Sequence, residues 1–167
     1  MILLGIDPGT AKTGYGIIEV NKAKRGVGDF SLKLIDYGRI TTSKDQLMPE
    51  RLLKIYNSTK ELVLKYSPDA FVIERLFFNT NTKTALSVGQ ARGLHILIAG
   101  ENKMPVFEYT ALEAKMTLTG YGRSEKEEVR AKVAEALGVE LLKGRGIDSS
   151  DALAIAICHV MKGSIIK

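Results

Sequence analysis

The order of strand-like and helix-like segments constrains the fold of this chain more than any other feature of its sequence. Three extended segments come first, and two short apolar segments then each follow a segment with helical apolar spacing. The predicted strands span residues 2–6, 13–20, 32–41, 69–74 and 105–109. A strand that returns after a helix lies parallel to an earlier strand, whereas closely connected strands pair antiparallel. The sequence therefore predicts an α/β fold with a five-stranded mixed sheet flanked by helices.

The helices of this sheet are predicted from apolar spacing and boundary residues. They span residues 49–66, 82–100, 110–118, a segment that begins at 124, and 148–161. Ser124 stands three residues before Glu127, the spacing of a capping box, so the fourth helix is expected to begin at this serine. The last helix is rich in small apolar residues from Ala152 to Ala156, which favours close packing on the sheet.

Composition places the chain among ordinary globular proteins. Its 167 residues, 45% apolar and 26% charged, contain no repeat or low-complexity tract, so a single domain over residues 1–167 is expected. Cys158 is the only cysteine, and one thiol forms no internal disulfide, which fits a reducing compartment such as the cytoplasm. The sequence shows neither a signal peptide nor a stretch long enough to span a membrane. The net charge of +5 favours a polyanionic partner.

Acidic residues stand where two of the predicted buried strands end. Asp7 follows the first strand, and Glu74 ends the fourth. Sites in open α/β sheets gather beyond the carboxyl ends of the strands, so the two acids are candidate site residues. Taken singly, each acid is better explained in a simpler way, Asp7 as a turn aspartate in Asp-Pro-Gly and Glu74 as a surface glutamate beside Arg75.

Two further acids, Asp148 and Asp151, open the last helix. Their separation of three residues puts both on one helical face. Helix capping by an aspartate is the simpler explanation if they act alone. If they meet Asp7 and Glu74, however, the four charges repel and require cations. Two Mg²⁺ ions would neutralise them and serve phosphodiester hydrolysis, and Mn²⁺ can substitute at an all-oxygen site.

Several separated motifs resemble, in order, the RuvC-type Holliday-junction resolvases, crossover junction endodeoxyribonucleases with a ribonuclease H-like fold. The matching segments are Gly-Ile-Asp-Pro-Gly-Thr at 5–10, Thr-Gly-Tyr-Gly at 13–16, Ile-Glu at 73–74, Gly-Gln-Ala-Arg-Gly at 89–93 and Asp-Ser-Ser-Asp-Ala-Leu-Ala at 148–154. They extend over nearly the whole chain. The resemblance implies that Asp7, Glu74, Asp148 and Asp151 are the catalytic, metal-binding acids. It also implies paired, symmetric nicks in a four-way DNA junction during homologous recombination and DNA repair.

The same resemblance suggests DNA contacts. Phe77 matches an aromatic residue that the family uses at the junction, where a ring can stack on an exposed base. Lys115 and Lys126 match family lysines near the scissile backbone. Arg123 is added as part of the positive surface. A core phenylalanine and solvated surface charges are the alternative explanations.

Symmetry predicts a homodimer, because one domain with one site does not cut two opposed strands together. Gly89 and Gly93 lie four residues apart on the second helix, where they permit close contact with another helix or with the sheet. The resemblance further implies cooperation with the RuvA and RuvB branch-migration proteins.

Three other functions compete with this prediction. The first motif also resembles the phosphate loop of actin-like ATPases and sugar kinases, but those proteins need two such domains and more residues than this chain has. RuvC-like RNA-processing nucleases share the first motif, although the paired terminal aspartates and the lysines favour a resolvase. A junction-binding module without catalysis is the third, yet all four acids are present.

Overall fold

A computed structural model gives the fold. It describes the chain apart from residues 23–29, 76–81, 141–146 and 164–167 and the side chains of residues 22, 82–84, 147 and 148. The strands are β1 (Ile2–Asp7), β2 (Lys12–Lys22), β3 (Phe30–Thr41), β4 (Ala70–Glu74) and β5 (Val106–Tyr109). The helices are α1 (Met48–Tyr66), α2 (Thr82–Glu101), α3 (Ala111–Thr119), α4 (Lys126–Leu137) and α5 (Ile147–Met161). Within the described ranges, no helix has the length and apolar character of a membrane span.

The five strands form one mixed sheet in the order β3-β2-β1-β4-β5, which confirms the predicted fold class. The first three strands pair antiparallel, as a meander. Strands β4 and β5 each follow a helix and pair in parallel, β4 with β1 and β5 with β4. In this register Ile6 is the partner of Ile73, so the residues that follow them, Asp7 and Glu74, leave neighbouring strands at the same edge.

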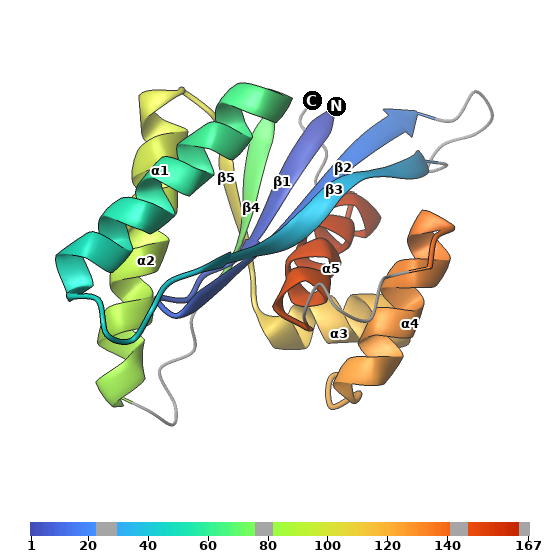
Figure 1. Ribbon diagram of the computed structural model, residues 1–167. Helices are drawn as coiled ribbons and strands as arrows, with labels where there is room; N and C mark the ends of the chain where they lie inside the picture. The colour runs from blue at the N-terminus through green and yellow to red at the C-terminus, as the bar shows by residue number, and fades with distance from the viewer. Residues whose placement is uncertain (23–29, 76–81, 141–146, 164–167) are drawn as a thin grey trace.

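Helices cover the sheet on both faces (Figure 1). Helices α1 and α2 lie on one side, and α3, α4 and α5 lie on the other. Each interface has its own apolar core. Side chains such as Leu4, Phe71 and Ile98 pack on the α1–α2 side, while Leu3 of β1 and Leu153 of α5 belong to the core on the other side. The central strands are thus apolar on both faces, which explains their continuous aliphatic sequence.

Helix α5 lies unusually close to β1 and β2 because both strands carry a glycine beneath it. A Cβ atom on Gly5 would lie 2.1 Å from the Ala152 carbonyl oxygen, and one on Gly16 would lie 2.5 Å from the Leu153 side chain. Residues without a Cβ are therefore required at these two contacts. The predicted close packing of the last helix is confirmed, and it holds the N-terminal end of α5 against the sheet.

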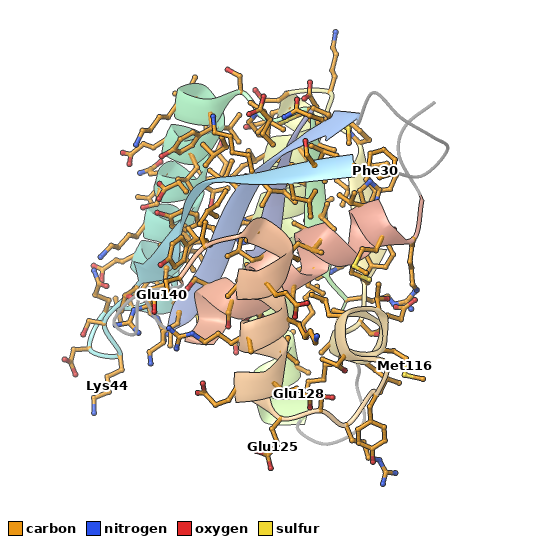
Figure 2. All side chains as sticks on the ribbon, turned by 90° about the vertical axis from the view of Figure 1, so that its right-hand side faces the viewer. Phe30, Lys44, Met116, Glu125, Glu128 and Glu140 are labelled. Atoms are coloured by element: carbon orange, nitrogen blue, oxygen red, sulfur yellow. The ribbon has the colours of Figure 1, made fainter. Side chains whose placement is uncertain are left out.

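The start of α4 differs from the sequence-based prediction. The helix begins at Lys126 with Glu125 as its N-cap, and the Glu125 side chain makes no capping hydrogen bond but points away from the protein (Figure 2). Ser124 is not the cap because its hydroxyl is buried and lies 2.8 Å from the Thr119 hydroxyl at the end of α3. A contact with the preceding helix therefore replaces the local capping bond.

Candidate active site

Strands β1 and β4 bring the first two predicted acids together. Asp7 is the last residue of β1, Glu74 is the last residue of β4, and both are partly buried. Their side chains share a hydrogen bond. Two adjacent carboxylates repel each other, and a shared proton or bound cations relieve this repulsion.

Helix α5 supplies the third acid. Asp151 lies in the first half of the helix, near the sheet edge where β1 and β4 end, and its Oδ2 atom is 3.4 Å from Nζ of Lys126. Asp148 belongs to the first turn of the same helix, one turn before Asp151, but its side chain lies outside the described residues. The structure therefore brings Asp7, Glu74 and Asp151 together and leaves the placement of the Asp148 carboxylate as a prediction.

The three acids line one pocket of about 270 Å³. Helices α3 and α4 form its opposite wall. The residues that line it are Asp7, Glu74, Ala111, Ala114, Lys115, Lys126, Val129, Asp151, Ala154 and Ile155. Acids from the sheet and α5 thus face lysines from α3 and α4 across a small cleft whose remaining walls are apolar.

Burial is the main influence on Glu74 and raises its pKa above the ordinary value. The negative charge of Asp151 acts in the same direction. The hydrogen bond with Asp7 and the positive charges of Lys126 and Lys115 oppose this rise. Raised carboxylate pKa values and flanking cations are typical of sites that hold an anionic substrate or metal ions, because both relieve the repulsion.

Lys115 and Lys126 line the pocket beside the acids, on its α3–α4 wall. Lys115 donates to the Ser124 carbonyl oxygen at 2.8 Å, and this bond ties α3 to the segment that begins α4. An ammonium group has three donors, so one bond leaves capacity for a phosphate oxygen. Arg123 is exposed in the connection between the two helices and does not line the pocket. Phe77 lies outside the described residues.

The donor chemistry of the pocket fits a hard divalent cation. Its lining includes carboxylates but no histidine or cysteine, and oxygen ligands are those that Mg²⁺ and Mn²⁺ prefer. Within the described part of the chain, no group of three or more acidic, histidine or cysteine side chains is arranged as a ready ligand set. The described acids are paired with one another and with Lys126 instead.

Comparison with known proteins identifies the family. The family model "Crossover junction endodeoxyribonuclease RuvC" matches residues 3–159. The chain belongs to the RuvC family. The crossover junction endodeoxyribonuclease RuvC of Caldicellulosiruptor saccharolyticus is 43% identical over 166 residues, which cover 99% of this chain and 96% of the relative. The RuvC of Alkaliphilus metalliredigens is 45% identical over 163 residues, covering 98% of this chain and 94% of the relative.

A solved RuvC structure also has the same fold. Thermus thermophilus RuvC superposes with a TM-score of 0.84 at 32% identity, and the match covers 99% of this chain and 96% of that one. The same enzyme in complex with a Holliday junction substrate gives a TM-score of 0.84 at 29% identity, with the same coverage. The ribonuclease H-like fold predicted from the motifs of the RuvC family is thereby confirmed.

The pocket wall formed by α3 and α4 was not predicted from the sequence. Ala111, Ala114 and Val129 were not singled out, because small apolar residues on helices carry no chemical signature. The beginning of α3 was detectable, however. Thr110 and Glu113 have the Thr-x-x-Glu spacing of a capping box, and both bonds of that box are formed.

Proposed function

We propose that this chain resolves four-way DNA junctions by nicking two opposed strands, as a Mg²⁺-dependent crossover junction endodeoxyribonuclease. One observation carries the assignment of the site: acids at the ends of β1 and β4 and on α5 face two lysines across one pocket. Membership of the RuvC family supports the reaction and the substrate, including a role in recombination and repair. The four acids appear in the order and spacing of the family motifs.

Asp7, Glu74, Asp148 and Asp151 are the residues that would hold two Mg²⁺ ions, for which Mn²⁺ can substitute. When bound, such ions supply an activated water and stabilise the leaving oxygen during phosphodiester hydrolysis. Asp7 would hold the ions together with Glu74 and Asp151, because these three carboxylates line the same pocket. Bound cations would also offset the repulsion between these carboxylates, which Lys126 partly offsets through its ion pair with Asp151.

The remaining site residues would hold the DNA. Lys115 and Lys126 line the pocket with the acids, so a scissile phosphate that enters it would meet both ammonium groups. Arg123 is exposed near the start of α4 and would contact the backbone farther from the cut. Phe77, three residues after Glu74, is proposed to stack on a junction base.

The functional assembly is proposed to be a two-fold homodimer that presents two sites to a two-fold junction. The outer face of α2 is the candidate contact. Nothing in the described structure lies within 4 Å of a Cβ placed on Gly89 or Gly93, so they do not serve packing against the sheet. Leu86 and Leu97 on the same face are 73% and 53% exposed. RuvA and RuvB remain the partners implied by the family, and a cytoplasmic location is proposed because the substrate is DNA.

The decisive experiment uses a labelled four-way junction with and without Mg²⁺. We expect symmetric nicks in opposed strands that require the metal. Asp7→Asn should lose at least about a hundredfold in cleavage rate while it still binds the junction in Ca²⁺ buffer, because the amide removes a ligand charge but leaves the DNA surface intact. Asp45→Asn, at an exposed position, is the matched control and should cleave normally.

Binding without nicks by the unaltered protein would favour the non-catalytic module. Preferential cleavage of structured RNA would favour the RNA-processing nuclease. Retained nicking by Asp7→Asn would remove Asp7 from the proposed site.

A further inference from the structure

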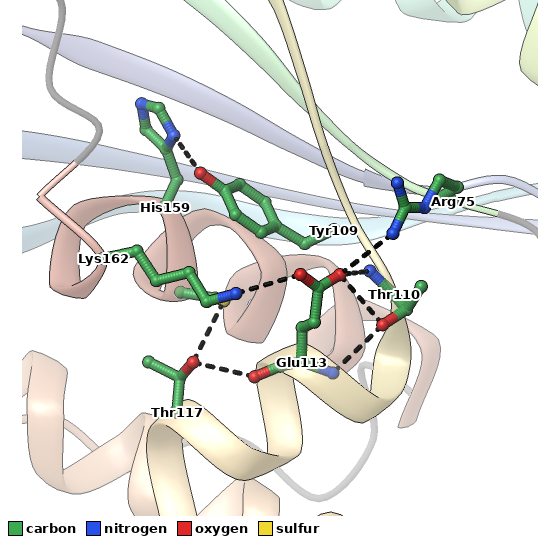
Figure 3. A network of polar contacts seen from close by, with 8 residues as sticks. Arg75, Tyr109, Thr110, Glu113, Thr117, His159 and Lys162 are labelled. Atoms are coloured by element: carbon green, nitrogen blue, oxygen red, sulfur yellow. Dashed lines mark hydrogen bonds and ion pairs between the residues drawn. The ribbon is translucent and has the colours of Figure 1, made fainter.

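Glu113, on the side of α3 away from the pocket, joins three segments of the chain (Figure 3). Its Oε2 atom accepts hydrogen bonds from the backbone N–H and hydroxyl of Thr110, at 2.8 and 3.0 Å. The same oxygen lies 3.5 Å from Nη2 of Arg75, and Oε1 accepts from Lys162 at 3.0 Å. One carboxylate thus meets the end of β5, the residue after β4 and the residue after α5.

The surroundings of this carboxylate keep it charged. The Thr110 backbone N–H and then the Lys162 ammonium lower the pKa of Glu113 to about 2. Lys162 also lies 5.3 Å from the centre of the Tyr109 ring, and the Tyr109 hydroxyl is 3.0 Å from Nδ1 of His159. Lys162 is therefore held by contacts of its own besides the one with Glu113. With so low a pKa, Glu113 is an anion at any pH at which the enzyme would work.

The contacts of Glu113 lead to two residues of the proposed site. Arg75 directly follows Glu74, and its backbone N–H donates to the Tyr109 carbonyl at 2.8 Å. Lys115 follows Glu113 by two residues, which places it about 200° around α3, on the opposite side. It therefore points into the pocket from the helix that Glu113 holds at its back.

We propose that Glu113 is a positioning residue that fixes α3 relative to β4 and α5, so that Lys115 and Glu74 face each other across the pocket. This inference rests on the proposed site. Helix capping alone accounts for the contacts with Thr110, but not for the approach of Arg75 and Lys162 from the ends of two other elements. Both ion pairs are partly exposed and contribute little to the free energy of unfolding, so the effect belongs to geometry more than to stability.

The variant Glu113→Gln tests the positioning of α3 separately from the capping of its N-terminus. A glutamine oxygen can still accept from the Thr110 N–H, because glutamine also forms capping boxes, but it cannot pair with Arg75 and Lys162 as an anion. We expect the single-turnover cleavage rate at saturating enzyme and Mg²⁺ to fall about fivefold, since small displacements of catalytic groups slow reactions markedly. The junction Kd should stay within about twofold, because no DNA contact is removed.

Glu135→Gln is the matched control. Glu135 pairs with Lys132 at 2.8 Å on the exposed side of α4, so this variant makes the same chemical change away from the site. Its cleavage rate should equal that of the unaltered protein. Lys162→Gln breaks one arm of the network without touching the cap, and it should slow cleavage by itself. The double variant Glu113→Gln/Lys162→Gln should be no slower than Glu113→Gln, because both changes break the same link.

An unchanged rate for Glu113→Gln and Lys162→Gln would overturn the proposal, as would rate losses that multiply in the double variant. A lower melting temperature with an unchanged rate would reduce Glu113 to a helix cap. These outcomes differ from the one that would disprove the proposed active site. Cleavage by Asp7→Asn would remove Asp7 from that site, whatever the results for the Glu113 variants.

Discussion

The two helical layers that cover the sheet are built in opposite ways. Beneath α5 the contact is close and complete, since Gly5 and Gly16 admit the helix and its residues 152–158 are all buried. On the other side, Gly89 and Gly93 of α2 face open space. On the first side, the strand glycines Gly5 and Gly16 hold α5, the helix that carries Asp151, close against the sheet. The other layer leaves its glycines outside, where another protein surface can use them.

The largest effect is expected when a methyl group is added to a glycine beneath α5. Gly5→Ala places a methyl group on the Ala152 backbone carbonyl, which cannot move without shifting α5, so we expect a loss of about 3 kcal/mol in unfolding free energy. Gly93→Ala should instead stabilise the isolated subunit by up to about 1 kcal/mol, because alanine favours a helix. Urea unfolding measures both. Equal effects at the two positions would contradict the contrast between the layers.

The second prediction concerns a histidine buried in the α1–α2 layer. His95 is fully buried, and its Nδ1 lies 3.3 Å from the Thr59 hydroxyl. Because that hydroxyl donates to the Ile55 carbonyl, Nδ1–H is the donor to Thr59. Nε2 is buried without a partner among the described residues. Burial lowers the pKa of His95 from 6.5 to about 4.

The unfolded chain therefore binds a proton between pH 6.5 and 4 that the folded protein does not, and stability falls as the pH drops through this range. At pH 5 the loss should reach about 2 kcal/mol relative to pH 7. His95→Gln should remove most of this dependence in urea unfolding at the two pH values. His159 is also fully buried, and burial lowers its pKa by less, so it should contribute less to this dependence. A steeper dependence on His159 would place the acid-sensitive contact beneath α5 instead.

The smallest effect tests which layer meets DNA. Lys115→Ala and Lys126→Ala should each weaken junction binding for every sequence and reduce the salt dependence of log K by about one unit, because one phosphate contact is lost. Lys54→Ala, on the α1 side of the sheet, is the control and should leave the salt dependence unchanged. If Lys54→Ala behaves like the other two, DNA contacts both layers.

The fold and the acids were predictable where local pattern determines structure. Asp7 and Glu74 end short apolar strands, and the connection through a helix requires parallel pairing, so their meeting at one edge follows from sequence order. Helical spacing placed Asp151 on one face with Asp148, and the family resemblance added its role in the site. The start of α4 was wrong because the Ser124 hydroxyl bonds to Thr119 rather than to its own helix. Which partner the serine hydroxyl takes depends on how α3 and α4 pack, and the apolar periodicity of the sequence gives no information on that packing.

Long-range polar contacts were beyond sequence analysis for a similar reason. Glu113 meets Arg75 and Lys162 across 38 and 49 residues of chain, and ordinary surface charges look the same in a sequence. The signal that was present, the Thr110–Glu113 capping box, predicts where α3 begins but not what else the glutamate contacts. The close approach of α5 was indicated by small residues, although its partners Gly5 and Gly16 become evident only in the sheet.

The chain positions of the acids have a consequence for protein synthesis. Asp7 lies near the beginning of the chain, Glu74 near its middle, and Asp151 in the last helix, yet they line one pocket. A ribosome releases them in that order, and a growing chain without α5 lacks both the third acid and the helix that seals β1. The nascent polypeptide therefore carries no complete site until α5 has been translated.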